Sequence, residues 1–226
     1  IAAAKRQLDP LFFAQEFQAD FVTFTGAVYQ GCVESQVLAT DEAVRAVLPE
    51  WPHVDPSRIC YVGLDPGTDH PFAAALAVST DRGLVQIGEY LARNRAVHEH
   101  KRHLLALLAK WNPAQPFQPE QWAIDRSQRQ MAIELAQPPY AISVVGAEND
   151  VRAGINRVSA WFLTNRYWII QSECPRTIEQ LRGYAWEPTM KADGTYRLER
   201  PRKVDDDLPD AVRYLARRTI SDAFRD

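Results

Sequence analysis

The chain has 226 residues, of which 46% are hydrophobic and 24% are charged, and its formal net charge is −3. This composition argues against a chain that is disordered throughout, and the small negative charge gives no sign of an overall basic field for nucleic acid. Three cysteines without a C-x-x-C pair indicate a reducing compartment and argue against structural zinc, and no stretch has the length of an apolar membrane span.

The first 57 residues have a different pattern from the rest. We predict a short amphipathic helix over 11–17, a short strand over 21–24 and one or two helical turns over 41–48. Pro49 closes these turns, and Pro52 and Pro56 then mark a linker. The chain begins with Ile rather than Met, so we expect it to be a piece of a longer protein.

From Arg58 onward, strand and helix patterns alternate. We predict strands over 59–64, 72–79, 84–90, 121–124 and 141–145, and helices over 96–111, 127–136, 150–165, 175–183 and 207–220. A turn signal at Asp193-Gly194 predicts a hairpin with arms over 186–191 and 195–200. An opening meander followed by alternating helices and strands indicates an α/β fold, with a mixed sheet, helices on both faces and an added β-hairpin.

Acidic residues stand at three places that are far apart in the sequence. Asp65 ends the first of these strands, before a Pro-Gly turn, and Asp125 ends the fourth. Asp206, Asp207 and Asp210 surround the start of the last helix. Sites in α/β sheets form outside the carboxyl ends of the strands, so these carboxylates are expected to meet there. Carboxylate oxygens without cysteine or an obvious histidine favour Mg²⁺ or Mn²⁺.

Each acid also has a simpler interpretation. Asp65 would start a turn, Asp125 would cap the helix that follows, and Asp207 would be the N-cap of the last helix. Capping does not explain Asp205 and Asp206, whose charges repel their neighbours unless solvent or a cation neutralises them. If the acids are only caps, the chain is a non-catalytic DNA-binding or docking module.

The residues around these acids resemble the nuclease domain of the large terminase subunit, the DNA-packaging motor of tailed bacteriophages. The matching motifs are G-x-D-P-G at 63–67, Ala-Ile-Asp at 123–125 and D-D-x-x-D-A-x-R-Y at 206–214. Residues 11–29 look like the stretch that joins the ATPase domain of the motor to its nuclease. The resemblance implies a ribonuclease H-like nuclease domain over 58–226, preceded by a linker or extension over 1–57 from an ATPase domain that this chain lacks.

The resemblance also implies an activity, namely metal-dependent endonucleolytic cleavage of double-stranded DNA during viral genome packaging. One ion would be held by Asp65 and Asp125, and a second by Asp65 with Asp207 or Asp206, whereas Asp210 ranks below these two. In the full-length protein the implied partners are the portal and the small terminase subunit, with no membrane, in the host cell cytoplasm. No G-x-x-x-x-G-K-S/T motif is present, so ATP hydrolysis by that route is not expected.

DNA approaching an acidic pocket needs positive charge around the rim. Seven basic residues near the second carboxylate and the hairpin are candidates for this role: Arg126, Arg129, Lys191, Arg197, Arg200, Arg202 and Lys203. They would contact the phosphate backbone rather than the bases.

Two rival enzyme classes stay open at this point. A Holliday-junction resolvase-like nuclease of the same fold would share the metals and differ in the DNA shape it prefers. The run Asp65-Pro66-Gly67-Thr68 also resembles the first phosphate loop of actin-like and sugar-kinase-like phosphotransferases. Those folds need further glycine-rich loops, and this chain has only ten glycines and no later Gly-Gly pair.

Overall fold

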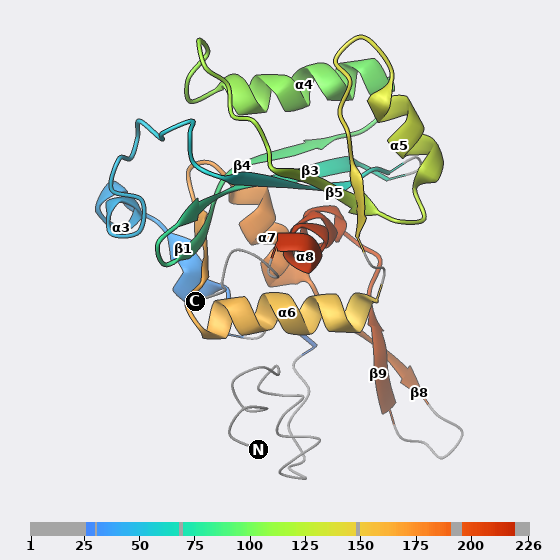
Figure 1. Ribbon diagram of the computed structural model, residues 1–226. Coiled ribbons are helices and arrows are strands. Elements are labelled where there is room, and N and C mark those ends of the chain that lie inside the picture. The colour runs from blue at the N-terminus through green and yellow to red at the C-terminus, as the bar shows by residue number, and fades with distance from the viewer. Residues whose placement is uncertain (1–25, 30, 68–69, 148–149, 191–195, 220–226) are drawn as a thin grey trace.

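The computed structural model describes residues 26–29, 31–67, 70–147, 150–190 and 196–219. Its centre is a seven-stranded sheet in the order β1-β7-β4-β3-β2-β5-β6 (Figure 1). The strands are β1 (Val37–Leu38), β2 (Cys60–Asp65), β3 (Phe72–Thr80), β4 (Gly83–Ala92), β5 (Gln121–Asp125), β6 (Val145–Ala147) and β7 (Tyr167–Ile170). β2, β3 and β4 form an antiparallel meander, and the other neighbours pair in parallel, which confirms the predicted mixed sheet.

Helices cover both faces of this sheet, as predicted. They are α3 (Asp41–Arg45), α4 (Val97–Ala109), α5 (Arg129–Ala136), α6 (Val151–Leu163), α7 (Pro175–Gly183) and α8 (Asp207–Thr219), with a short 3-10 turn, η2 (Glu34–Gln36). Figure 1 shows α4 and α5 over one face, and α6, α7 and α8 over the other. α8 lies against β2, β3 and β5 and also contacts α6 and α7.

The predicted hairpin is also present. β8 (Trp186–Met190) and β9 (Tyr196–Pro201) pair as a separate two-stranded sheet that projects away from the body of the protein (Figure 1). Its predicted turn at Asp193-Gly194, the predicted helix over 11–17 and the predicted strand over 21–24 lie outside the described residues. Among the described helices, none combines the length and hydropathy that crossing a membrane requires.

The two sides of the sheet bury different cores because side chains alternate along a strand. On β3, Ala73, Ala75 and Ala77 belong to the core beneath α6, α7 and α8. Leu76 and Val78 of the same strand belong to the core beneath α4. The small alanine side chains leave room for α8 to lie close to the middle of the sheet. The acids at the start of α8 are thereby brought near the strand ends.

Gly63 of β2 is a point of close approach between the sheet and α8. A Cβ atom there would lie 2.0 Å from the carbonyl oxygen of Ala211 and 2.8 Å from Cβ of Leu215. Gly63→Ala is therefore expected to lower the free energy of unfolding by about 1–3 kcal/mol, because backbone atoms of α8 must shift. Urea unfolding measures this change. Gly183→Ala is the matched control, since no atom lies within 4 Å of the added Cβ; equal losses in the two variants would contradict the prediction.

Two strands of the sheet were not predicted, and one was misplaced. β1 and β7 pair with each other through Val37 and Ile169, and neither is predicted from the sequence. β7 is a buried run of four residues directly after α6, and such short apolar runs do not distinguish a strand from the end of a helix. The strand predicted over 141–145 is β6 at 145–147.

Part of the predicted extension packs with the main body. β1 is an edge strand of the large sheet, and Val28, Tyr29 and Val33 lie in the same core as α8. Val44 and Leu48 lie in the core on the opposite face. The division of the chain after residue 57 stays a prediction.

Candidate active site

Two of the predicted acids end neighbouring parallel strands. Leu64 of β2 is paired with Ile124 of β5, and Asp65 and Asp125 are the next residues of the two strands. Leu64 and Ile124 both belong to the core beneath α4, so alternation directs both aspartates to the opposite face, where α8 lies. Asp65 is 8% exposed and Asp125 is 9% exposed. The two acids therefore stand at the same edge of the sheet and on the same face.

Asp207 approaches Asp65 from the first turn of α8. The first hydrogen bond of this helix runs from the Asp210 N–H to the Asp206 carbonyl, so Asp206 rather than Asp207 has the N-cap position. The backbone N–H of Leu208 donates to Oε1 of Gln180, on α7, at 2.8 Å. The capping interpretation of Asp207 is therefore wrong, and its carboxylate has a different partner.

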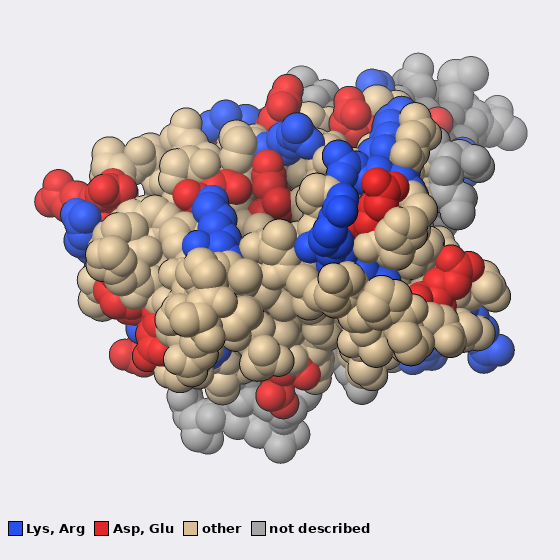
Figure 2. All heavy atoms as spheres, turned by 90° about the horizontal axis from the view of Figure 1, so that it is seen from above, with Lys and Arg blue, Asp and Glu red and all other residues tan. Residues whose placement is uncertain are grey.

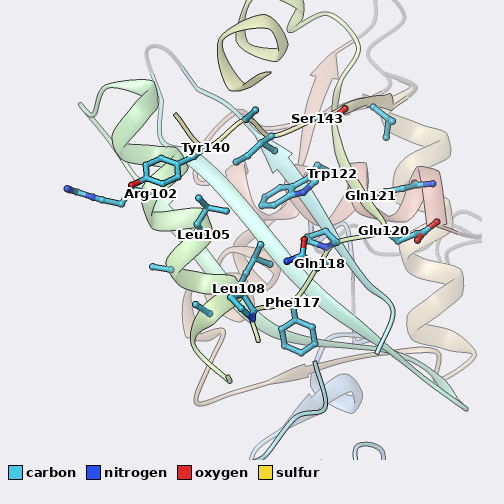
Figure 3. Close-up of a pocket in the computed structure, with 17 residues that line it drawn as sticks. Arg102, Leu105, Leu108, Phe117, Gln118, Glu120, Gln121, Trp122, Tyr140 and Ser143 are labelled. Carbon is cyan, nitrogen blue, oxygen red and sulfur yellow. The ribbon is translucent and has the colours of Figure 1, made fainter. Parts of the chain in front are cut away.

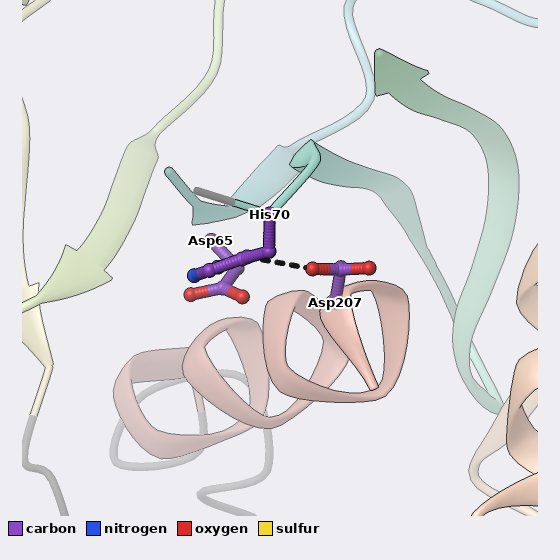
Figure 4. Close-up of side chains that lie close together, drawn as sticks. All are labelled: Asp65, His70 and Asp207. Carbon is purple, nitrogen blue, oxygen red and sulfur yellow. Dashed lines mark hydrogen bonds and ion pairs between the residues drawn. The ribbon is translucent and has the colours of Figure 1, made fainter. Parts of the chain in front are cut away.

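That partner is His70, which the sequence analysis did not single out. Nδ1 of His70 lies 2.7 Å from Oδ1 of Asp207. Asp65, His70 and Asp207 each offer one ligand atom, and these three atoms lie within 4.8 Å of one another (Figure 4). The sequence holds only a weak signal for His70, namely its place in the short return from β2 to β3, five residues after Asp65.

Asp125 stands beside this cluster but is not part of it. Its Oδ1 accepts a hydrogen bond from the backbone N–H of Ser127 at 2.7 Å, which is the turn interaction expected from the simpler interpretation. Its Oδ2 accepts a hydrogen bond from the hydroxyl of Tyr214, on α8, at 3.0 Å. Tyr214 thus ties the end of β5 to the helix that carries Asp207.

The remaining two acids are neutralised by the protein itself. Nζ of Lys203 lies 2.8 Å from Oδ2 of Asp206 and 3.0 Å from Oδ2 of Asp210. Arg213 contacts both oxygens of Asp210, with Nε 3.2 Å from Oδ1 and Nη2 3.1 Å from Oδ2. The Tyr184 hydroxyl donates to Oδ1 as well, at 3.2 Å. Because both oxygens of Asp210 are occupied by donors, this residue acts as an anchor for α8.

The pKa values distinguish the carboxyl groups of Asp65 and Asp207 from that of Asp210. Burial, followed by the nearby charge of Asp210, raises the pKa of Asp65 from 3.8 to about 7. Burial also raises the pKa of Asp207, although the hydrogen bond with His70 opposes this shift. Burial alone would raise the pKa of Asp210, but Arg213 and Lys203 outweigh it and hold that pKa below its ordinary value. Negative charge at Asp65 is therefore unfavourable unless a cation joins it.

The predicted DNA-contacting residues have different surroundings. Arg126 and Arg129 are exposed and follow Asp125, and Arg202 is exposed beyond the hairpin. Arg200 pairs with Glu187 at 2.8 Å, and Lys203 bridges the two acids described above. Lys191 and the side chain of Arg197 lie outside the described part of the chain. On the face covered by α4 and α5, basic and acidic side chains are interspersed (Figure 2).

A separate pocket of about 760 Å³ opens beside α4 (Figure 3). Its walls include Leu105 and Leu108 of α4, Phe117 and Trp122. None of the predicted acids lines it. This pocket lies at the amino end of β5, so it is distinct from the carboxyl edge where Asp65 and Asp125 stand.

No protein-family model and no curated protein matches the chain. Several solved structures are similar to it. The large terminase of a thermophilic bacteriophage, in complex with ADP, has a TM-score of 0.74 and 20% identity over 96% of this chain and 51% of that one. The P22 large terminase nuclease domain has a TM-score of 0.60 and 16% identity over 89% of this chain and 99% of that one.

A third similar structure is the large terminase nuclease domain from bacteriophage SPP1 with bound Mn. Its TM-score is 0.54 at 15% identity, and the match covers 80% of this chain and 94% of that one. The chain thus spans about half the length of the ADP-bound terminase but nearly matches the nuclease domains in extent. These similarities confirm the ribonuclease H-like fold that the sequence motifs implied.

Proposed function

We propose that this chain is the nuclease region of a large terminase subunit, and that it hydrolyses phosphodiester bonds of double-stranded DNA with the help of divalent metal ions during viral genome packaging. The observation that carries the proposal is the cluster of Asp65, His70 and Asp207, with Asp125 on the adjacent strand, at the carboxyl edge of the sheet. The similarity in fold to terminase nuclease domains supports the same function.

The residues present are suited to Mg²⁺ or Mn²⁺. Within the described ranges, no donor forms a hydrogen bond with the Asp65 carboxylate, although this side chain is more than nine-tenths buried. A buried carboxylate without a donor is costly, and a divalent ion relieves that cost. Asp65, Asp125 and Asp207 would hold the metal, and we propose two ions with Asp65 shared between them. Such ions, when bound, activate a water molecule and neutralise charge on the leaving oxygen.

The surrounding side chains keep the acids in position. Tyr214 of α8 holds Asp125 of β5 through its hydroxyl, and the next residue back, Arg213, pairs with Asp210 one turn earlier in the same helix. Lys203 is already paired with Asp206, and we therefore place Asp207 ahead of Asp206 as a metal ligand. Asp210, with both oxygens occupied, is proposed as a structural residue rather than a ligand.

Contact with DNA is proposed for the predicted basic residues near this edge. Arg126 and Arg129 are exposed and directly follow Asp125, and Arg200 and Arg202 are exposed at the end of β9 and just after it. Lys191 and Arg197 are proposed from the sequence. These side chains would bind phosphates rather than bases. In the full-length protein we propose the portal and the small terminase subunit as partners, in the host cell cytoplasm.

Incubation of supercoiled plasmid with the chain tests this function. Cleavage is expected in the presence of Mn²⁺ or Mg²⁺. It should stop when a chelator is added and return when metal is restored. Asp65→Asn is expected to remove cleavage. Asp81→Asn, in the exposed turn between β3 and β4, is the matched control and is expected to cleave like the wild type. Full cleavage by Asp65→Asn would refute the assignment. A strong preference for four-way junctions over duplex would favour a resolvase instead.

A further inference from the structure

His70 is a nitrogen donor inside a cluster of oxygen donors. Its side chain is 50% exposed, whereas that of Asp207, which it contacts, is only 5% exposed. The ring also lines a pocket of about 340 Å³, together with Gly67, Asn94, Arg95 and Gln128 among others. His70 is therefore accessible from solvent on one side and in contact with the buried acids on the other.

Gly67 lies directly beside this ring and the backbone of His70. A Cβ atom on Gly67 would lie 2.2 Å from the carbonyl oxygen of His70 and 2.5 Å from its Nδ1. Only glycine at position 67 leaves the space that the His70 ring occupies. The sequence Asp65-Pro66-Gly67 thus does more than turn the chain, because it lets His70 lie against the strand end.

We infer that His70 is a direct ligand of a divalent ion at this site, alongside Asp65 and Asp207. This inference rests on the metal dependence proposed above. Donor atoms that share an octahedral ion at about 2.1 Å are about 3.0 Å apart when adjacent and about 4.2 Å apart when opposite. The three ligand atoms, all within 4.8 Å of one another, need only small movements to reach these separations. Asp65, which is buried and accepts no hydrogen bond within the described chain, contributes one of these three atoms.

A nitrogen ligand changes which ion the site prefers. Mg²⁺ strongly prefers oxygen ligands, whereas first-row transition ions also accept the nitrogen of an imidazole. A site with His70 as a ligand should therefore bind Mn²⁺ more tightly than Mg²⁺. A site with carboxylates alone would give a smaller difference between the two ions.

The alternative role for His70 is to orient Asp207 through their hydrogen bond. His70→Asn separates the two roles, because an asparagine amide can still donate to Asp207 but supplies no imidazole. His70→Ala removes both, and His98→Ala, an exposed histidine on α4, is the matched control. Circular dichroism of each variant checks that the fold is retained.

The decisive measurement is pulsed electron paramagnetic resonance of Mn²⁺ bound to the whole chain, which detects nitrogen bonded directly to the ion. Calorimetric titrations with Mn²⁺ and Mg²⁺ accompany it. We expect a nitrogen signal in the wild type and in His98→Ala, and none in His70→Asn or His70→Ala. Mn²⁺ affinity should fall by about 10-fold or more in both His70 variants. Mg²⁺ affinity should change far less.

Two results would overturn the inference while leaving the metal site intact. The first is Mn²⁺ binding, lost in Asp65→Asn, without a nitrogen signal in the wild type. The second is a nitrogen signal, or full Mn²⁺ affinity, that persists in His70→Asn. If Mn²⁺ does not bind the wild type at all, or binds Asp65→Asn equally well, then the proposed metal function fails and this inference fails with it.

Discussion

Asp65→Asn is expected to stabilise the metal-free protein at pH 8 by about 4 kcal/mol, although the same substitution is expected to remove the proposed cleavage. The pKa of Asp65 is about 7 in the folded protein instead of 3.8. This difference of about 3 units corresponds to about 1.36 kcal/mol for each unit. As the pH rises from about 4 to 7, the unfolded chain loses this proton while the folded chain retains it. The wild type therefore loses stability over that range, and the asparagine variant does not.

Urea unfolding at pH 4, 6 and 8 in the presence of a chelator measures this difference. The gap between Asp65→Asn and the wild type should be small at pH 4 and largest at pH 8, whereas Asp81→Asn should follow the wild type throughout. If Asp65 binds the metal as proposed, Mn²⁺ should raise the stability of the wild type but not of Asp65→Asn, because a ligand that binds only the folded state stabilises it. A gap that does not vary with pH would show that Asp65 is ionised in the metal-free fold.

Arg213→Met is expected to destabilise the protein by about 3–5 kcal/mol, because it leaves a buried carboxylate without its main cation. Arg213 is 1% exposed and Asp210 is 3% exposed, and the two side chains share two contacts. Arg182→Met is the matched control, because Arg182 also contacts both oxygens of one acid, Glu34, but at the surface. Loss of that exposed pair should change stability by about 1 kcal/mol or less. Urea unfolding of both variants gives the comparison.

The cause of the Arg213 effect can be tested with a second substitution. If the loss comes from an uncompensated charge, Arg213→Met combined with Asp210→Leu should recover at least half of the stability lost by Arg213→Met alone. If the loss comes from missing packing contacts of Arg213, the double variant should be no more stable than the single one. The second result would mean that Asp210 is not anchored by charge.

Local sequence patterns were enough to predict an element wherever that element carries its own signal. The acids at 65 and 125 end apolar strand runs, and those at 206 and 207 stand at the start of an amphipathic helix, so their places in the fold could be read locally. Local patterns were not enough where pairing partners decide the structure. β1 has only two residues, and it is a strand because Val37 and Leu38 pair with Ile169 and Ile170 of β7. Nothing within residues 37–38 contains that information.

The sequence by itself determined which carboxylates stand at strand ends and at the start of the last helix, because those positions follow from local patterns of apolar and turn residues. Only the tertiary structure decided which of them are already paired with basic side chains. Lys203 and Arg213 occupy Asp206 and Asp210, whereas Asp65 keeps its carboxylate free of donors in the described chain. His70 joins Asp207 across 137 residues of sequence. The interaction between two charges depends on their separation in space and not along the chain. The close packing of α8 against Gly63 brings the start of that helix, with Asp207, near Asp65.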